Sequence, residues 1–349
     1  MIRFGTLAFN EEEKKAIEDL INAKEPQLSM GKKVAEFEKK FADWLGVKHA
    51  VMVNSGTSAL IVALEAYNNL YSHGPLLTTS LTYPADWNAL RVTNTPYEIA
   101  DVCSDLVFHE DDQTECLAVH LLGKPCRVNA IIEDTAEAMG STLKGKKLGS
   151  FGLMSTFSFY VAHQINTIEG GMVATNNDKL YEVCRSIRDN GRTCTCPICT
   201  LKSSGACSKR QKETLSCERR WETSISRGYN FKPLDIQGAL GVVKMKTIDE
   251  NCKRRNEIFL RYSEAFKGFK QEEDEFIVSI AYPLKVKRPL EAVAKLEKDG
   301  IECRGMFPAY SRIFRNAYKI ERSHILLPLH QEMTDKDVDF VIEKAKLCQ

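Results

Sequence analysis

Residues 50–67 read AVMVNSGTSALIVALEAY, and this stretch decides the fold. The apolar run Ala50–Val53 predicts a short buried strand, and a glycine turn follows it directly. The next residues predict a helix with one buried face, because apolar side chains recur at helical spacing. Those apolar positions are Leu60, Ala63, Leu64 and Tyr67. A strand, a turn and a helix in this order predict the first unit of an α/β fold.

The same alternation continues beyond this unit. Cys116–His120 and Ala130–Ile132 are further short apolar runs, so residues 45–180 predict an α/β domain with a largely parallel sheet. From about residue 245, a long polar helical pattern leads to Ile277–Ile280 and then to a helix around Leu290–Asp299. We therefore expect a large domain over residues 1–244 and a smaller C-terminal α/β domain over residues 245–349.

Composition narrows the class of protein. The 349 residues include 48 basic and 47 acidic side chains, and no basic run is long enough to follow a phosphate backbone. This balance argues against a nucleic-acid partner. The sequence also shows neither a secretory leader nor an apolar stretch of membrane length, so we expect a cytoplasmic protein with no membrane partner.

Cysteine is unusually frequent, with 12 residues in the chain. Five of them fall within residues 192–228, where neither helical nor strand periodicity is present, which predicts an inserted cysteine-rich loop. In a chain of this size without a leader, clustered thiols are more often metal ligands than disulfides. We interpret the other seven as buried or isolated thiols: Cys103, Cys116, Cys126, Cys184, Cys252, Cys303 and Cys348.

A candidate phosphate site lies at the start of the first helix. The backbone N–H groups of Gly56 and Thr57 are expected at the positive end of the helix dipole. Ser55 and Thr57 add hydroxyl donors, and Gly56 allows an anion to approach the backbone closely. Taken alone, these residues are more typical of an ordinary N-capped helix after a glycine turn.

A candidate site for a cofactor ring follows a later strand. Glu133 and Asp134 stand at its carboxyl end, where open α/β sheets bind ligands. A carboxylate that keeps a pyridine nitrogen protonated makes the ring an electron sink, and Asp134 is our candidate for this partner. Its alternative role is a helix N-cap. Tyr83 is the preferred aromatic face for the ring and Trp87 the second, although either residue could belong to the core.

Seven motifs in order resemble the DegT/DnrJ/EryC1/StrS sugar-aminotransferase family. The resemblance implies a pyridoxal-phosphate (PLP)-dependent transferase of fold type I, in which the large domain has a mainly parallel seven-stranded sheet. It further implies a homodimer with shared active sites. Gly56, Thr57 and Ser158 would hold the cofactor phosphate, Asn230 would come from the neighbouring subunit, and Glu137 would join the cofactor-binding residues. The motifs are Ser55–Leu60, Glu133–Asp134, Gly149–Gly152, Phe157–Tyr160, Glu169–Val173, Gly228–Asn230 and Asp235–Gln237.

His163 stands where this family carries its cofactor-binding lysine. A lysine would hold the cofactor covalently and transfer a proton, whereas an imidazole can only transfer the proton. The substitution therefore predicts a cofactor bound noncovalently as pyridoxamine phosphate (PMP). Three alternatives remain. His163 could be a satisfied core histidine, the chain could be a noncatalytic binding protein, or an aminotransferase could use another lysine, among Lys144, Lys146, Lys147 and Lys179.

Because it carries His163 in place of the lysine, the chain resembles one branch of the family, the 3-dehydratases of nucleotide-linked 4-keto-6-deoxy sugars. Residues 188–196 and 207–210 are similar to the cluster segment of its iron–sulfur subtype, CDP-4-keto-6-deoxyglucose 3-dehydrase. The resemblance implies PMP-dependent C3 dehydration and deoxygenation of a nucleotide sugar. His163 would be the proton shuttle, and electrons would pass from a flavin or iron–sulfur reductase through the cluster.

One difference from the iron–sulfur subtype leaves the identity of the bound metal undetermined. The iron–sulfur subtype has a further cysteine near the ring-partner aspartate, whereas this chain has none in Asp134–Glu137. Cys199 is the nearest substitute and Cys217 the next. The ligand set would then be Cys194, Cys196, Cys199 and Cys207, which suits a [2Fe–2S] cluster, a [4Fe–4S] cluster or zinc. With structural zinc, the reaction would resemble that of the cluster-free subtype. Unligated surface thiols are the remaining alternative.

Overall fold

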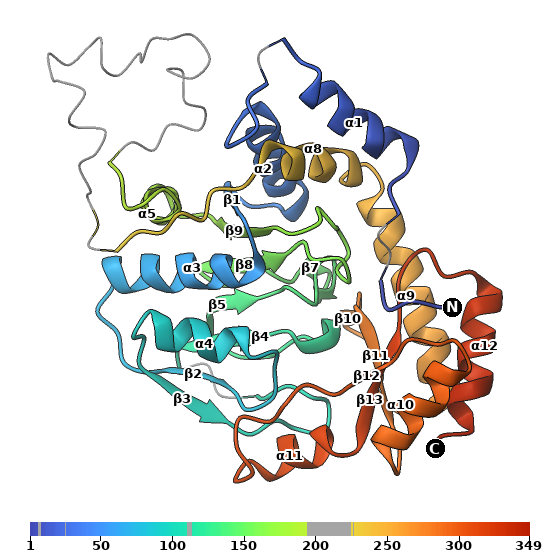
Figure 1. Cartoon of the computed structure of the whole chain (residues 1–349). Helices are drawn as coiled ribbons and strands as arrows, with labels where there is room; N and C mark the ends of the chain where they lie inside the picture. Colours follow the sequence, from blue (N-terminus) through green and yellow to red (C-terminus); the bar gives the residue numbers. More distant parts are fainter. Residues whose placement is uncertain (6–7, 25, 110–113, 194–224, 226) are drawn as a thin grey trace, which may run out of the picture.

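The computed structural model describes residues 1–349 except 6–7, 25, 110–113, 194–224 and 226. At its centre is a seven-stranded sheet with strand order β1-β9-β8-β5-β4-β2-β3 (Figure 1). The run β8-β5-β4-β2-β3 is parallel, and β9 is antiparallel to both its neighbours. The predicted mainly parallel seven-stranded sheet is thus confirmed. Its strands are β1 (His49–Val53), β2 (Leu76–Thr79), β3 (Tyr97–Ala100), β4 (Cys116–Val119), β5 (Ala130–Asp134), β8 (Met154–Ser158) and β9 (Gly171–Thr175).

Helices cover both faces of this sheet. Successive strand side chains point to opposite faces, so Val51 and Val53 join one core cluster while Ala50 and Met52 join another. The helices over the first cluster are α3 (Gly56–Leu70), α4 (Ala85–Val92) and α5 (Asp178–Arg188). On the other side lie α2 (Lys32–Leu45) and α8 (Asp235–Lys244), with α1 (Glu11–Ile21) packed on α8.

Helix α3 corrects the prediction of a single buried face. Every residue from Ser58 to Tyr67 is buried, because the helix packs against β8 and β9 below and against α4 and α5 at its sides. The stripe from Leu60 to Tyr67 is only part of its buried surface. Even the Glu65 carboxylate is inside, where it accepts a hydrogen bond of 2.9 Å from the Tyr229 hydroxyl.

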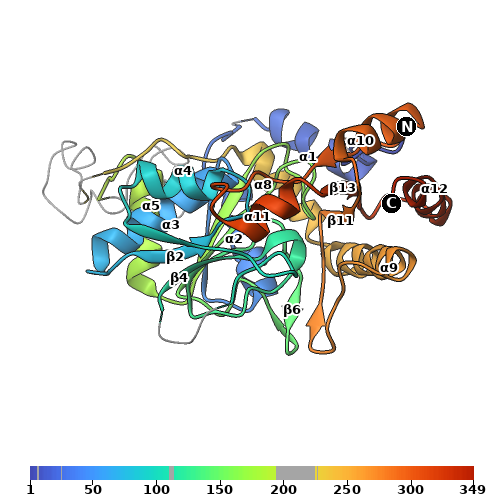
Figure 2. The ribbon, with the colours of Figure 1, turned by 90° about the horizontal axis from the view of Figure 1, so that it is seen from below.

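The C-terminal elements form a second core beyond one end of the sheet (Figures 1 and 2). An antiparallel sheet of order β11-β13-β12 packs there with three helices. The expected helices near residues 245 and 290 are present, while a domain boundary at residue 244 stays a prediction. The elements of this core are α9 (Ile248–Phe266), β11 (Ala281–Lys285), α10 (Pro289–Lys298), β12 (Arg304–Gly305), β13 (His324–Pro328) and α12 (Asp335–Lys346). Helix α11 (Arg315–Glu321) lies between β12 and β13 in the chain and packs in another core cluster.

Residues Ile277–Ile280 are not a strand, although their apolar pattern resembles one. They connect β10 (Glu275–Phe276) to β11. Side chains rather than a neighbouring strand satisfy their backbone: Val278 N–H donates to Ser141 Oγ at 2.8 Å, and Val278 O accepts from Gln164 Nε2 at 2.9 Å. β10 instead extends the hairpin of β6 (Thr142–Leu143) and β7 (Lys146–Lys147). A short 3₁₀ helix, η1 (Leu121–Gly123), follows β4.

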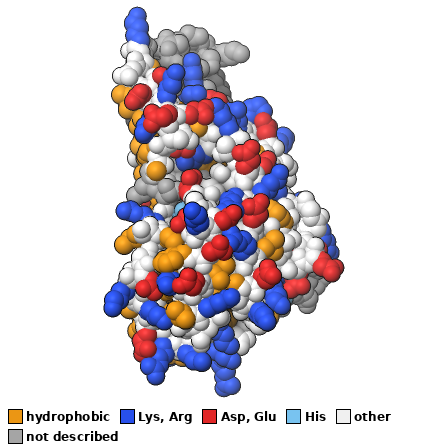
Figure 3. Space-filling view, turned by 90° about the vertical axis from the view of Figure 1, so that its right-hand side faces the viewer, with side chains coloured by type: hydrophobic (Ala, Val, Ile, Leu, Met, Phe, Trp, Pro, Cys, Tyr) orange, Lys and Arg blue, Asp and Glu red, His pale blue; other side chains and the backbone are white. Residues whose placement is uncertain are grey.

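Figure 3 shows the face that carries α12, where basic and acidic side chains are interspersed. On this face Asp335 accepts hydrogen bonds from Arg254 at 2.8 Å and Arg261 at 2.9 Å, which ties α9 to α12. Across the described ranges, no helix combines the length and the apolar character that spanning a bilayer requires. The predicted cysteine ligands Cys194, Cys196, Cys199 and Cys207, and Cys217 with them, lie outside the described residues.

Candidate active site

A cavity of about 490 Å³ lies at the carboxyl ends of the central parallel strands. Thr82 follows β2, His120 follows β4, Asp134 ends β5 and Ser158 ends β8, so the topology brings these residues to one edge of the sheet. All but one of the noncysteine site residues predicted from the sequence line this cavity. They are Ser55, Gly56, Thr57, Tyr83, Asp134, Glu137, Ser158 and His163.

The N-terminus of α3 forms one end of the cavity. Ser55 caps this helix, since its Oγ accepts from Ser58 N–H at 3.1 Å. The first-turn N–H groups have no partner inside the helix and suit an anion. A Cβ at Gly56 would stand 2.7 Å from Ser158 Cβ, which only glycine avoids. The N-cap interpretation and the phosphate interpretation of this stretch are therefore compatible.

Three carboxyl groups also line the cavity: the buried Asp86 and Asp134 and the half-buried Glu137. Asp134 Oδ1 accepts from Ala136 N–H at 2.9 Å, and Thr82 Oγ1 donates to Asp86 Oδ2 at 2.7 Å. Burial raises the pKa of both aspartates, and the neighbouring Asp134 charge raises that of Asp86 further. Burial, with Asp134 second, raises the pKa of Glu137 to about 8. A cation bound among these groups would relieve their repulsion.

Sequence reasoning missed Asp86, which follows the motif containing Tyr83. A single aspartate near the start of a helix gives no distinctive signal, and only the fold places it beside Asp134. Tyr83 stands at the cavity mouth with 60% of its surface exposed, so its ring is free to cover a cofactor. Trp87, the second candidate, is a core residue whose Nε1 donates to Thr79 O at 3.0 Å.

His163 lies on the loop between β8 and β9 and lines the cavity. Its Nδ1 is buried and has no hydrogen-bond partner among the described residues. Burial, followed by the positive charge of Arg255, lowers the pKa of His163 to about 3. The imidazole is therefore neutral at pH 7 and carries one ring nitrogen without a protein partner. A core histidine satisfied by hydrogen bonds, one alternative from the sequence, does not match this environment.

Arg255 of α9 fixes the backbone of the His163 loop. Its Nη2 donates to His163 O at 3.2 Å and to Ala162 O at 3.4 Å, while Nη1 donates to Ser279 O and Leu329 O, both at 3.0 Å. The side chain is 1% exposed, and it donates to carbonyl oxygens and to the Gln331 amide oxygen. Nothing in the sequence distinguishes Arg255 from Arg254, so this contact also escaped prediction.

No lysine in the described part of the chain lines the cavity. The four nearby lysines weighed from the sequence belong elsewhere. Lys146 Nζ lies 4.3 Å from the centre of the Phe151 ring, and Lys147 Nζ lies 4.4 Å from that of Trp44. Lys144 stands in the β6–β7 turn and Lys179 in α5. The structure thus brings His163, and none of these lysines, to the cavity.

Glu133 and His120 form a buried pair beside the cavity. His120 Nε2 is 3.0 Å from Glu133 Oε2, and its Nδ1 accepts from Cys126 N–H at 3.1 Å. Glu133 also accepts from the N–H groups of Gly149, Phe151 and Gly152 at 2.6–2.8 Å. His120 lines the cavity, but both its ring nitrogens are engaged by the protein, which favours a structural role.

Asn230 does not line the cavity of its own chain. It is exposed, and it pairs with Asp189 in an isolated antiparallel bridge. This position leaves the predicted contribution to a second subunit's site untested. Among the described cysteines, Cys116, Cys126, Cys184, Cys252 and Cys303 are buried, as expected, whereas Cys103 is exposed.

The central sheet and this cavity define a PLP-dependent aminotransferase-like fold. The model of the DegT/DnrJ/EryC1/StrS aminotransferase family matches residues 8–346, so the chain belongs to this family. A GDP-4-keto-6-deoxy-D-mannose 3-dehydratase of Yersinia pseudotuberculosis is 31% identical, over 87% of this chain and 84% of the relative. A UDP-4-amino-4,6-dideoxy-N-acetyl-beta-L-altrosamine transaminase of Campylobacter jejuni is 29% identical, over 91% and 90%.

Solved structures agree on the fold. The E. coli GDP-4-keto-6-deoxy-D-mannose-3-dehydratase with bound hydrated PLP superposes with a TM-score of 0.83 at 23% identity, covering 99% of each chain. A Helicobacter pylori aminotransferase of pseudaminic acid biosynthesis gives a TM-score of 0.78 at 24% identity, covering 99% of this chain and 98% of the other. The comparisons therefore include both dehydratases and aminotransferases.

Proposed function

We propose that this chain is a PMP-dependent 3-dehydratase of a nucleotide-linked 4-keto-6-deoxy sugar, with His163 as its proton shuttle. One observation carries the proposal: His163 lines the cavity, and no lysine among the described residues does. The Yersinia relative named as a 3-dehydratase supports the same reaction class. Because relatives named as transaminases are equally similar, amine transfer is the competing function.

The cavity residues fit a pyridoxal-type cofactor. The helix N-terminus at Gly56, with the hydroxyls of Ser55, Thr57 and Ser158, would hold the phosphate, in a cradle that a Cβ at position 56 would fill. Asp134 would pair with the pyridine nitrogen, and the raised pKa values around it fit a site completed by a cation. When bound, the cofactor supplies an amine for the sugar ketone and an electron sink.

His163 would then move the proton. As a neutral imidazole it would accept a proton at a ring nitrogen, and the Arg255 contacts hold its backbone in place. Return of that proton to the departing C3 hydroxyl would complete the general acid–base cycle.

The metal bound by the cysteine-rich segment would determine the last step of the proposed reaction. If Cys194, Cys196, Cys199 and Cys207 hold an iron–sulfur cluster, a flavin or iron–sulfur reductase supplies two electrons and the deoxygenation is reductive. If they hold structural zinc, an amino donor such as glutamate regenerates the amine instead. Iron and sulfide analysis of protein purified without oxygen separates these endings, and zinc alone would eliminate the electron-transfer step.

Product analysis tests dehydration against amine transfer. Protein loaded with PMP is incubated with glutamate and either GDP-4-keto-6-deoxy-D-mannose or CDP-4-keto-6-deoxy-D-glucose, with and without a flavin reductase and NADH. We expect a 3-deoxy-4-keto sugar by mass spectrometry and no nitrogen in the sugar. An amino sugar that keeps its C3 hydroxyl would overturn the proposal.

A further inference from the structure

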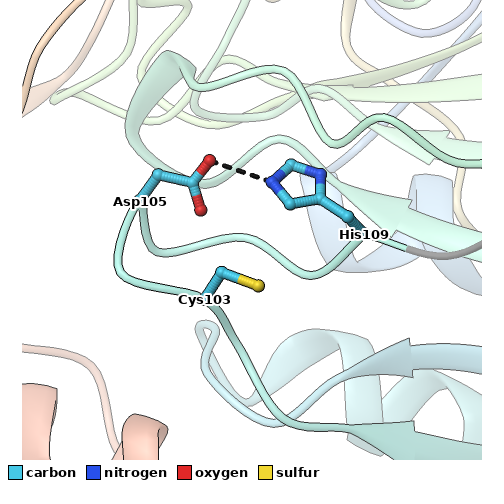
Figure 4. A group of neighbouring side chains, drawn as sticks. All are labelled: Cys103, Asp105 and His109. Atoms are coloured by element: carbon cyan, nitrogen blue, oxygen red, sulfur yellow. Dashed lines mark hydrogen bonds and ion pairs between the residues drawn. The ribbon is translucent and has the colours of Figure 1, made fainter.

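The loop between β3 and β4 brings together three side chains that the site above does not use. Cys103, Asp105 and His109 converge on a common space, as Figure 4 shows. Their sulfur, oxygen and nitrogen atoms all lie within 4.8 Å of one another, and His109 Nε2 is 2.9 Å from Asp105 Oδ2. The cysteine was interpreted from the sequence as isolated, and the turn of the chain corrects this.

Hydrogen bonds and core packing hold the backbone of residues 103–108. Cys103 N–H donates to Val107 O at 2.8 Å, and Leu106 N–H donates to Cys103 O at 3.2 Å, which closes a tight turn. Leu106, Val107 and Phe108 are at most 2% exposed and belong to a core cluster. Cys103, Asp105 and His109 flank these anchored residues, so their backbone positions are well constrained.

The contacts of this group suit a cation. Asp105 Oδ1 is buried and has no hydrogen-bond partner among the described residues, which is costly for a carboxylate oxygen. A divalent cation would satisfy this oxygen, and the neighbouring thiol and imidazole would supply further ligand atoms.

We propose that Cys103, Asp105 and His109 bind one divalent transition-metal ion, with Zn²⁺ as the expected occupant. One thiolate, one carboxylate and one imidazole form a ligand set that zinc accepts. Zinc bonds of 2.0–2.3 Å place tetrahedral ligands roughly 3.3–3.8 Å apart, so side-chain rotations within the present cluster suffice. The exposure of Cys103 leaves room for water at the fourth position.

The ion would stabilise the loop that docks helix α11. Asp101, two residues before Cys103, accepts from Asn316 N–H at 2.9 Å and from Ala317 N–H at 3.0 Å. Asn316 Nδ2 also donates to Val102 O at 2.9 Å. A metal at this loop therefore strengthens the attachment of a C-terminal helix to the edge of the central sheet and stabilises the folded chain.

Co²⁺ binding to the full-length chain provides the test. A parent variant with serine at Cys194, Cys196, Cys199, Cys207 and Cys217 removes thiols that would obscure the signal, and reducing agent is kept present throughout. We expect one Co²⁺ per chain, with a sulfur-to-cobalt charge-transfer band that Cys103→Ser abolishes. His109→Gln should weaken Co²⁺ binding about tenfold or more, whereas Cys348→Ser should leave it unchanged.

A second measurement avoids dependence on the five-serine parent. Zn²⁺ should raise the melting temperature of the EDTA-treated natural chain, and Cys103→Ser with His109→Gln should reduce this rise. Equal Co²⁺ stoichiometry, band and affinity in parent and Cys103→Ser would overturn the site, as would an unchanged Zn²⁺-induced rise in the double variant. These outcomes are independent of the dehydratase proposal, because Cys103 and His109 do not line the active-site cavity.

Discussion

Two adjacent carboxylates at the end of β5, Glu133 and Asp134, differ in role: one is held by the protein and the other faces the cavity. Strand alternation sends the Glu133 side chain to three backbone N–H groups and His120, while Asp134 faces the cavity. Burial alone would raise the pKa of Glu133, but the hydrogen bond and charge of His120 and the N–H groups hold it below the usual value. The sequence shows two neighbouring acids here, and only the alternation of side chains along the strand shows which of them faces the cavity.

The contact between Gly56 and Ser158 leads to the first prediction. Gly56→Ala should weaken PMP binding about tenfold and cost roughly 1–3 kcal/mol of stability, because its Cβ would stand 2.7 Å from Ser158 Cβ. Fluorescence titration with PMP and urea unfolding measure the two effects. Gly74→Ala is the matched control, since its Cβ meets nothing within 4 Å. Equal PMP affinity in both variants would contradict the phosphate assignment.

His163 supports a second prediction. His163→Asn should lower turnover about 10²–10⁴-fold while PMP binding changes little, because the imidazole moves protons and does not hold the phosphate. His163→Lys should give a cofactor adduct that borohydride traps on residue 163. His73→Gln, on an exposed segment after α3, serves as control. If neither His163 variant changed turnover or trapping, position 163 would not be the proton shuttle.

Glu137 supports a prediction about pH in the cofactor-free protein. Its folded pKa of about 8 lies above the ordinary value of 4.5, so its favourable contribution is complete below pH 4.5 and is lost as the pH rises through 8. Glu137→Gln should therefore gain stability relative to the parent across this window, by up to about 1.4 kcal/mol per pH unit. Melting curves from pH 4.5 to 9 measure it. A difference independent of pH would show that Glu137 ionises normally.

At the scale of elements, α9 supports a loop that it does not adjoin in sequence. Arg255 joins the His163 loop, the segment at Ser279 and the end of β13 through four carbonyl oxygens. A guanidinium suits this geometry because its donors form a fixed planar fork. The arrangement makes the position of His163 depend on the C-terminal half of the chain.

Arg255→Lys should therefore reduce both stability and turnover. Lost donors leave buried carbonyls unsatisfied, at a cost on the order of 3 kcal/mol, and displacement of the His163 loop should lower kcat about 100-fold. Arg254→Lys is the matched control on the same helix, since its partner Asp335 is exposed and the pair contributes about 1 kcal/mol or less. Urea unfolding and steady-state kinetics measure both. A kcat unchanged in Arg255→Lys would remove its positioning role.

Elements with a clear period were predictable from the sequence, whereas irregular ones were not. β1, β5, α9 and α10 lie where apolar runs or helical spacing placed them. Ile277–Ile280 has a strand's composition, but side chains distant in sequence take its backbone hydrogen bonds. Helix α3 was predicted too amphipathic because flanking helices, which no local pattern reveals, cover its other sides. Long-range partners account for both errors.

Across the whole chain, the sequence predicted the site residues that belong to motifs, but it did not predict the residues that support them. Ser55, Asp134, Ser158 and His163 carry recognisable surroundings in the sequence and meet at one cavity. Asp86 and Arg255 act through proximity alone, and Cys103, Asp105 and His109 come together through a tight turn. Asn230 does not line the cavity of its own chain, so its predicted role requires the expected homodimer.

Subunit complementation tests the expected homodimer. If Asn230 completes the neighbouring subunit's site, Asn230→Ala and His163→Asn should each inactivate the protein. Coexpressed together, they should restore about a quarter of normal activity, because half of randomly paired dimers carry one intact site. Size-exclusion chromatography with light scattering checks the dimer itself. Failure of the mixed sample to exceed both parents would show that Asn230 does not complete the neighbouring subunit's site.

The burial of Ser58–Tyr67 in α3 has a consequence for cofactor exchange. A helix packed in this way resists shifting to admit a ligand, so we expect the phosphate end of the cavity to be rigid. Tyr83 and Arg304 line the same cavity and are exposed. If PMP binds here without a lysine tether, as proposed, its residence time would be governed by these exposed side chains, and its release rate would be adjustable without altering the phosphate cradle.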